Sequence, residues 1–202
     1  MLTTPLRSDN LSSCTGMVVS QSLSSMPLLS LSDKLNGEQL QDEEWQSSAL
    51  SSFSTRFTVY LKENGFVILE NGTVPWLTAT QVTNLLKDHQ FGSHDDRIDF
   101  LRGTECIFLG STVSGSNRFC VTMLRDSIHS YCQKMWQTRA STQDVMREHT
   151  HAIETVNILR NIQSKLHFHD AHQFCGVCGS RCRSVEFGLR RQCDGCTKRY
   201  YW

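Results

Sequence analysis

The sequence predicts an α+β protein with a small antiparallel-sheet domain, a connecting helix and a C-terminal four-cysteine zinc ribbon. Three observations predict this class. Two pairs of short β-rich runs lie between residues 57 and 125, a helical period begins at residue 142, and two CxxC pairs follow. The expected boundaries are a leader over 1–56, the sheet domain over 57–141, the helix over 142–171 and the ribbon over 172–202.

Composition narrows the class of protein. The chain has 202 residues with 20 basic and 20 acidic side chains, so no global attraction to nucleic acid or to a membrane surface is implied. The longest apolar runs are far too short to span a bilayer, and we expect a soluble protein without a membrane partner.

Four of the nine cysteines stand in CxxC pairs, which is typical of an intracellular metal site rather than a secreted disulfide framework. We expect an intracellular protein, cytoplasmic first, with mitochondria and peroxisomes as alternatives.

The leader, residues 1–56, is rich in serine, threonine and leucine. Arg7 is its single early basic residue, so neither a secretory signal nor an arginine-rich transit peptide is indicated. Segments of this composition bury too little apolar surface to offset the entropy lost on ordering. We therefore expect a disordered leader, with ordered structure starting near Phe57.

Two hairpins are predicted in the sheet domain. Residues 57–61 and 66–69 are β-rich runs separated by the Asn-Gly dipeptide at 64–65, which is typical of a tight hairpin turn. Residues 106–109 and 119–124 form a second pair across a turn rich in serine and glycine. Two such hairpins favour an antiparallel sheet.

The segment between the hairpins carries a weaker helix signal. Thr78 or Thr80 can cap a short helix. Its buried face would hold Val82, Leu85 and Leu86. The polar stretch that follows, residues 92–99, is expected to be a loop.

One amphipathic helix is predicted from Thr142 to about His167. Its apolar stripe recurs every three or four residues and comprises Met146, His149, Ile153, Val156, Leu159, Ile162 and Leu166. This helix leads directly into the cysteine-rich segment.

The two CxxC pairs, Cys175 with Cys178 and Cys193 with Cys196, predict a structural Zn²⁺ site. Each pair forms a knuckle that offers two thiolates from one tight turn. Two knuckles joined by a hairpin give the closed tetrahedral four-thiolate geometry that zinc prefers. The connecting segment alternates as a ribbon strand does, through Val185, Phe187 and Leu189. A closed four-thiolate shell leaves no open position for water, so the metal is expected to be structural and not catalytic.

Other metal-binding or reactive residues have plainer interpretations. Cys182 is an alternative ligand, but its spacing from Cys178 is not that of a knuckle. His167, His169 and His172 could bind a second metal, although surface or helix-end positions are the commoner reading.

The remaining cysteines are interpreted as ordinary thiols. Cys106, Cys120 and Cys132 are expected to be small apolar side chains that fill space. His129 and Cys132 are three residues apart, a common coincidence that does not by itself indicate a nucleophilic site.

The segment HQFCGVCG at 172–179, together with KRYY at 198–201, resembles the zinc ribbon of NADH pyrophosphatases. These are Nudix enzymes that also act on NAD-capped RNA. Their ribbon follows an N-terminal β-rich domain with an FLG stretch, a glycine turn and an aromatic-led strand; this chain has FLG at 108–110 and RFCV at 118–121. The resemblance covers about residues 100–201. It implies a homodimer, and NAD(H) or NAD-capped RNA as substrates of the full-length family members.

The chain departs from this family at the catalytic motif. The Nudix box, GxxxxxExxREUxEExGU with U a bulky apolar residue, holds Mg²⁺ or Mn²⁺ through its glutamates, and no such array occurs here. The acidic cluster at 42–44 lacks the framing glycine and arginine, and the chain ends at Trp202, about where the catalytic domain would begin. We expect a zinc-binding, non-catalytic portion of such a hydrolase with a structural and dimerising role, inactive on its own and with no catalytic residue. The alternative is a stand-alone ribbon that binds protein or single-stranded nucleic acid through its arginines and terminal aromatic residues.

Overall fold

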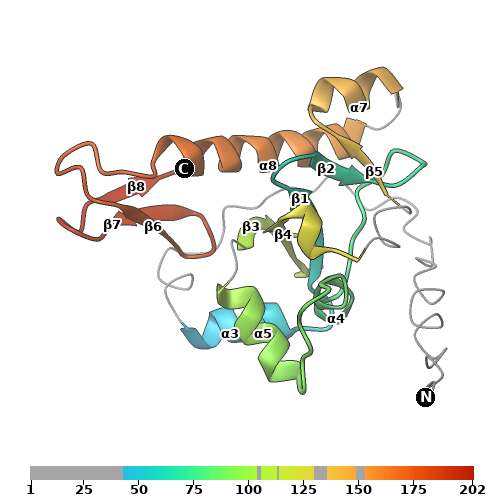
Figure 1. Ribbon diagram of the computed structural model, residues 1–202, viewed down its shortest axis with the longest axis horizontal. Helices are drawn as coiled ribbons and strands as arrows, with labels where there is room; N and C mark the ends of the chain where they lie inside the picture. Colours follow the sequence, from blue (N-terminus) through green and yellow to red (C-terminus); the bar gives the residue numbers. More distant parts are fainter. Residues whose placement is uncertain (1–42, 104–105, 113, 130–135, 149–152) are drawn as a thin grey trace, which may run out of the picture.

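The computed structural model describes residues 43–103, 106–112, 114–129, 136–148 and 153–202 (Figure 1). It confirms an α+β fold with a five-stranded sheet and a smaller three-stranded sheet near the C-terminus. A long helix runs along one side of the larger sheet and leads to the smaller one, while shorter helices lie on the opposite side (Figure 1). Within the described residues, no helix is both long enough and apolar enough to cross a membrane.

The larger sheet contains both predicted hairpins. Its strands are β1 (Arg56–Leu61), β2 (Gly65–Ile68), β3 (Cys106–Ser111), β4 (Asn117–Met123) and β5 (Gln137–Arg139). The β1/β2 and β3/β4 pairs are antiparallel, as expected. β5 adds to β2, also antiparallel, which gives the order β3-β4-β1-β2-β5.

The expectation of a wholly antiparallel sheet is wrong at its centre. β1 pairs with β4 in parallel over the full length of β1, from Arg56 against Arg118 to Leu61 against Met123. Parallel neighbours need a long crossover connection, and the helices between the two hairpins supply it. The sheet is therefore mixed.

The crossover contains two helices, of which the sequence predicted one. α4 (Ala79–Thr83) begins at Thr78, whose Oγ1 accepts a hydrogen bond from the Gln81 N–H at 3.2 Å while the Gln81 side chain accepts from the Thr78 N–H at 2.8 Å. This capping box confirms Thr78 over Thr80. Val82, Leu85 and Leu86 are buried as predicted, but only Val82 belongs to α4, because the helix ends at Thr83.

The loop expected at 92–99 is wrong, because α5 (His94–Gly103) begins within it. Ser93 and Asp96 exchange hydrogen bonds at its start, Ser93 N–H to the Asp96 carboxylate at 2.8 Å and Asp96 N–H to the Ser93 hydroxyl at 3.1 Å. Among residues 94–102 of this helix, only Ile98 and Leu101 are buried. Its first turn is polar and contains Asp95 and Asp96, so the sequence shows no clear helical period there. A short 3₁₀ helix, Arg125–Ser127, follows β4.

Part of the expected disordered leader is a packed helix. α3 (Glu43–Ser51) lies against the sheet domain with Ala49 and Leu50 buried. The Thr55 hydroxyl donates a 2.6 Å hydrogen bond to the Ala49 carbonyl oxygen, which holds the end of α3 against the start of β1. The ordered domain thus begins before Phe57. The rest of the leader, residues 1–42, lies outside the described residues.

The predicted connecting helix consists of two helices, α7 (Thr142–Glu148) and α8 (Ile153–Ala171). Figure 1 shows α7 above the start of α8, not in line with it. The apolar stripe is confirmed from Val156 onward, whereas Met146 and Ile153 are exposed. His149 lies outside the described residues.

The five-stranded sheet has an apolar core on each face. α8 covers one face through Val156, Leu159 and Ile162, which join Ile107 and Cys120 in one cluster. The other face packs against α3, α4 and α5; its cluster comprises Leu50, Phe57, Leu77, Val82, Leu101, Cys106, Phe108, Phe119 and others. Cys106 and Cys120 are buried as expected, but on opposite faces of the sheet. Cys132 lies outside the described residues.

The three-stranded sheet, β6 (Cys182–Val185), β7 (Arg190–Cys193) and β8 (Arg199–Tyr201), is antiparallel and is called the ribbon below. The strand alternation expected through Phe187 is wrong. Glu186, Phe187 and Gly188 all have positive φ and form the turn between β6 and β7. Phe187 lies at the tip of this turn and joins the core of the sheet domain.

Candidate metal centre

The four predicted cysteines converge at the end of the ribbon that lies opposite the turn at Phe187. Their Sγ atoms all lie within 4.8 Å of one another. Across the two knuckles, Cys175 Sγ lies 3.5 Å from Cys196 Sγ and Cys178 Sγ lies 3.3 Å from Cys193 Sγ. Sulfur ligands at about 2.3 Å from a tetrahedral zinc ion would be about 3.8 Å apart. The arrangement is therefore compatible with one structural zinc ion.

The local backbone holds these sulfur atoms as knuckles do. The Val177 N–H points to Cys175 Sγ at 3.4 Å, and the Gly195 and Cys196 N–H groups point to Cys193 Sγ at 3.3 and 3.4 Å. Gly195 has a steric role as well, since a Cβ there would overlap the Ser180 side chain. The second knuckle therefore requires a residue without a side chain at this position.

A tyrosine hydroxyl completes the first knuckle. The Tyr200 hydroxyl accepts a hydrogen bond from the Gly176 N–H at 2.9 Å and lies 3.2 Å from Cys175 Sγ, to which it donates. This hydrogen bond, with those from the Cys178 and Val177 amides, lowers the pKa of Cys175 to about 5. Zinc binds the thiolate form, so Tyr200 prepares the ligand for the metal. No local pattern predicted this contact, because it joins residues 25 positions apart.

Cys178, an exposed cysteine of the site, is prepared in a similar way. The Ser180 hydroxyl is the main cause of a lowered pKa at Cys178. Cys175 and Cys193 are buried, whereas Cys178 and Cys196 are exposed. Two sulfur atoms thus face the protein and two face solvent. Four protein sulfurs would fill a tetrahedral shell, which leaves no position for a reacting water.

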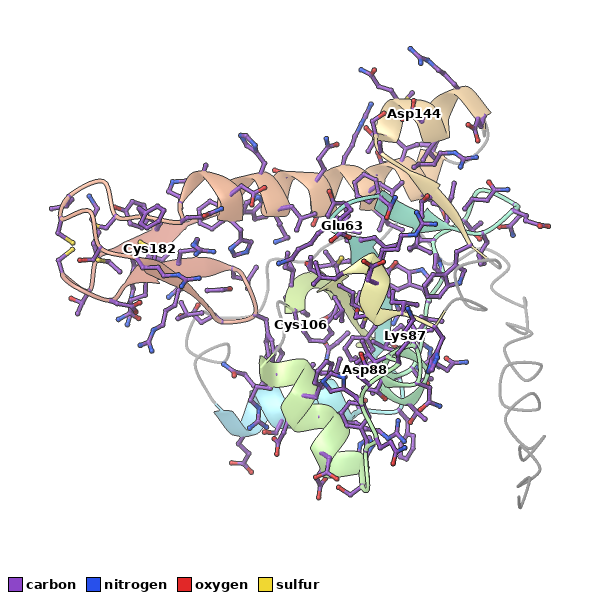
Figure 2. All side chains as sticks on the ribbon, in the orientation of Figure 1. Glu63, Lys87, Asp88, Cys106, Asp144 and Cys182 are labelled. Carbon is purple, nitrogen blue, oxygen red and sulfur yellow. The ribbon has the colours of Figure 1, made fainter. Side chains whose placement is uncertain are left out.

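Cys182 is near this group but is not one of the four. It pairs with Cys193 in the β6/β7 register and packs beside Cys175 and Cys193. Its side chain is 1% exposed, and burial is the main cause of its raised pKa. Figure 2 shows Cys182 within the ribbon. Its thiol fills space next to the four converging sulfur atoms.

The histidine cluster has structural contacts of its own. His169 Nε2 lies 2.9 Å from the Gly188 carbonyl oxygen, and its Nδ1 lies 3.1 Å from Arg191 Nη1. These partners fix a neutral ring that donates from Nε2 and accepts at Nδ1. His172 Nδ1 donates to the Phe168 carbonyl oxygen at 2.9 Å. Among the described residues, the four cysteines are the only group of three or more ligands placed to share a metal ion.

The structure does not test the spacing of His129 and Cys132, since Cys132 lies outside the described residues. His129 itself uses its backbone N–H to bond the Leu85 carbonyl oxygen at 2.9 Å.

No protein-family model matches the chain, and a search of the curated proteins finds no match.

Proposed function

We propose that this chain is a zinc-stabilised, non-catalytic portion of an NADH pyrophosphatase-type Nudix hydrolase, in which it has a structural and dimerising role. The observation that carries the proposal is the closed group of four cysteine sulfurs at one end of a three-stranded ribbon. The sequence resemblance around these cysteines supplies the family. NAD(H) or NAD-capped RNA would be the substrate only where a Nudix domain with its Mg²⁺ or Mn²⁺ accompanies this part.

The way in which the ribbon is attached supports a structural role for the metal. Trp202 Nε1 donates a 3.2 Å hydrogen bond to Ser164 Oγ, and the Lys165 ammonium lies 3.6 Å from the centre of the Trp202 ring. At the same end of the ribbon, where the Trp202 N–H bonds the Leu189 carbonyl oxygen, Phe187 inserts into the core of the sheet domain. Metal binding therefore stabilises a unit that α8 and the sheet both contact.

A fusion experiment tests this proposal. The chain would be joined in front of the Nudix domain of a known NADH pyrophosphatase, and dimerisation and NADH hydrolysis would be measured by sedimentation and by nucleotide analysis. We expect the fusion to be dimeric and more active than the Nudix domain alone, and the gain to be lost in Cys193→Ser. Clear turnover by the 202-residue chain alone, with Mg²⁺ or Mn²⁺ supplied, would overturn the proposal.

The alternative is a stand-alone ribbon that binds protein or single-stranded nucleic acid. Binding of nucleic acid would depend on the basic side chains of the ribbon. Several of these already have partners: Arg183 lies 3.5 Å from the Asp194 carboxylate, and Arg190 lies 3.0 Å from that of Glu186. Such pairing weakens the ribbon as a basic surface. Tight RNA binding by the isolated chain that falls steeply with salt concentration would favour this alternative.

A further inference from the structure

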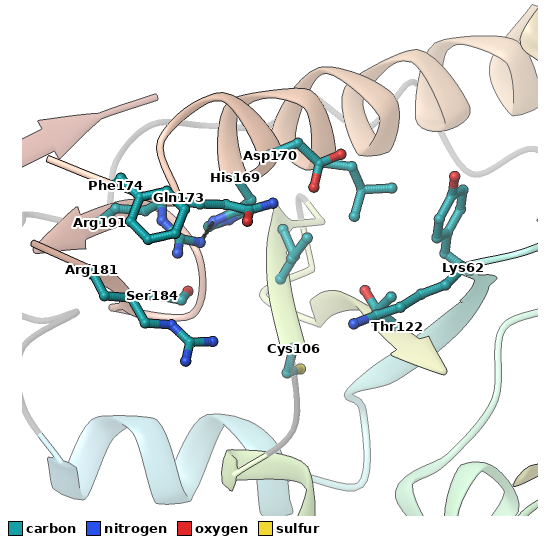
Figure 3. Close-up of a pocket in the computed structure, with 13 residues that line it drawn as sticks. Lys62, Cys106, Thr122, His169, Asp170, Gln173, Phe174, Arg181, Ser184 and Arg191 are labelled. Carbon is teal, nitrogen blue, oxygen red and sulfur yellow. Dashed lines mark hydrogen bonds between the residues drawn. The ribbon is translucent and has the colours of Figure 1, made fainter. Parts of the chain in front are cut away.

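A pocket of about 600 Å³ lies between the ribbon, the C-terminal end of α8 and one end of the five-stranded sheet (Figure 3). Its residues come from segments far apart in sequence, so only the folded chain creates it. The four metal-site cysteines are not among its lining residues. Its volume is in the range of small-molecule sites, about 300–1,000 Å³.

The charges that line this pocket favour an anion. Lys62 follows β1 on one side, whereas Arg181 and Arg191 extend from the ribbon on the other (Figure 3). Asp170 is the one carboxylate in the lining. Three cations against one carboxylate in a concave site create a positive potential.

The two arginines differ in how they are held. Arg191 donates to the Cys182 carbonyl oxygen and to His169 Nδ1, so its guanidinium is positioned before any ligand arrives. The Arg181 side chain is exposed and makes no hydrogen bond or ion pair with any other described residue. It is therefore available to a ligand without breaking a contact of the folded chain.

A buried hydroxyl gives an independent sign of a ligand. Thr122 lines the pocket and is 6% exposed, yet its Oγ1 has no hydrogen-bond partner among the described residues. Leaving a buried hydroxyl unpaired costs about 1–3 kcal/mol. The parallel register sets Thr122 beside Tyr60, which packs against the core cluster on the α8 face of the sheet. A polar ligand that reaches the sheet would satisfy this hydroxyl.

We propose that this pocket binds a small molecule that carries a phosphate group, with Arg181 and Arg191 on the ribbon side of the ligand and Lys62 on the sheet side. Forked guanidinium donors match phosphate oxygens, and hydroxyl donors commonly complete such sites. Ser184 and Thr122 supply those hydroxyls. Asp170 can accept hydrogen bonds from ligand hydroxyls, and the exposed ring of Phe174 offers a surface for a flat group.

Titration calorimetry of the metal-loaded full chain tests this proposal, with inorganic pyrophosphate as the first probe at low salt. We expect one binding site. Arg181→Ala should weaken binding about tenfold or more, because it removes a charged hydrogen-bond donor. Thr122→Val keeps the shape of the side chain and should weaken binding several-fold. The matched control is Arg183→Ala, which removes the same charge from a ribbon residue that does not line the pocket and should leave binding nearly unchanged.

Two outcomes would overturn the proposal: no binding of pyrophosphate, AMP or ribose 5-phosphate, or an equal loss in Arg183→Ala and Arg181→Ala. The latter result would mean nonspecific charge attraction. A comparison of AMP with ribose 5-phosphate identifies the source of the phosphate. Tighter binding of AMP that Phe174→Ala abolishes would assign a nucleoside phosphate, and equal affinities would assign a sugar phosphate.

Discussion

The backbone N–H of Phe108 donates a 2.8 Å hydrogen bond to the carbonyl oxygen of Phe187. Phe108 lies in β3 of the larger sheet, and Phe187 lies at the turn of the ribbon. The Phe187 ring packs 5.2 Å from that of Phe119 and 6.4 Å from that of Trp45, measured between ring centres. The ribbon and the sheet domain therefore share one core, and the stability of one depends on the other.

Metal removal should destabilise the whole described domain and not the ribbon alone. We expect one zinc per purified chain by elemental analysis, and a large drop in thermal stability after chelation. Binding to structural four-ligand sites is worth about 10–16 kcal/mol in zinc-finger peptides, so a loss of several kcal/mol is expected here. Tryptophan fluorescence should change too, since Trp45 contacts Phe187.

Cysteine variants separate the ligands from their neighbour. Cys193→Ser should lose the metal, whereas Cys182→Ala should keep one zinc ion per chain, because Cys182 lies outside the group of four sulfurs. Loss of zinc in both variants would show that Cys182 is a ligand. Identical melting of metal-free and metal-loaded protein would contradict a structural metal altogether.

Phe187→Ala should destabilise the protein by about 3–5 kcal/mol, the usual cost of removing a buried aromatic ring. The side chain is 8% exposed and contacts two other rings of the core. Phe53→Ala is the matched control, because Phe53 is 99% exposed and its loss should cost less than about 0.5 kcal/mol. Urea unfolding measures both. Equal effects would mean that the ribbon turn does not contribute to the core.

Tyr200→Phe should shift metal release to higher pH. The Tyr200 hydroxyl is the main cause of the lowered pKa of Cys175, which is about 5 in the folded chain. A lowered pKa means that the folded chain stabilises the thiolate. This contribution to stability is fully present above the ordinary pKa of a thiol, and it is lost as pH falls through about 5. Without the hydroxyl the pKa rises, so protons compete with the metal sooner.

Zinc release into a coloured chelator, followed over decreasing pH, measures this shift. Tyr201→Phe serves as the control, since its side chain is 61% exposed and is not hydrogen-bonded to Cys175. The release curve of Tyr200→Phe should lie at higher pH than that of the wild type, whereas the curve of Tyr201→Phe should coincide with it. A Tyr200→Phe curve that matches wild type would show that the hydroxyl does not act on the thiolate.

Cys106 and Cys120 should resist alkylation in the folded protein. Burial raises the pKa of both thiols, that of Cys120 to about 12, so almost no thiolate is present at neutral pH. They also face opposite sides of the sheet, which prevents a disulfide between them. Mass spectrometry after iodoacetamide treatment should find both unmodified until denaturant is added. Rapid labelling in native buffer would show that the sheet opens.

Features with a local cause were predictable from sequence. The spacing of Cys175, Cys178, Cys193 and Cys196 indicated one metal site, and the structure brings all four sulfurs together. Both hairpins and the cap at Thr78 follow from turn and capping residues, whose effects act over a few positions. The stripe from Val156 onward reflects the helical period itself.

Features that join distant residues were decided only by the tertiary structure. The parallel pairing of β1 with β4 depends on a crossover connection. The helix α3 is ordered because Leu50 packs into the core of the sheet domain. Phe187 has the alternation of a strand residue, yet it occupies a turn because the core of the sheet domain accepts its ring. The local sequence determines which backbone conformations have a low free energy. Burial against residues far along the chain then selects among these conformations.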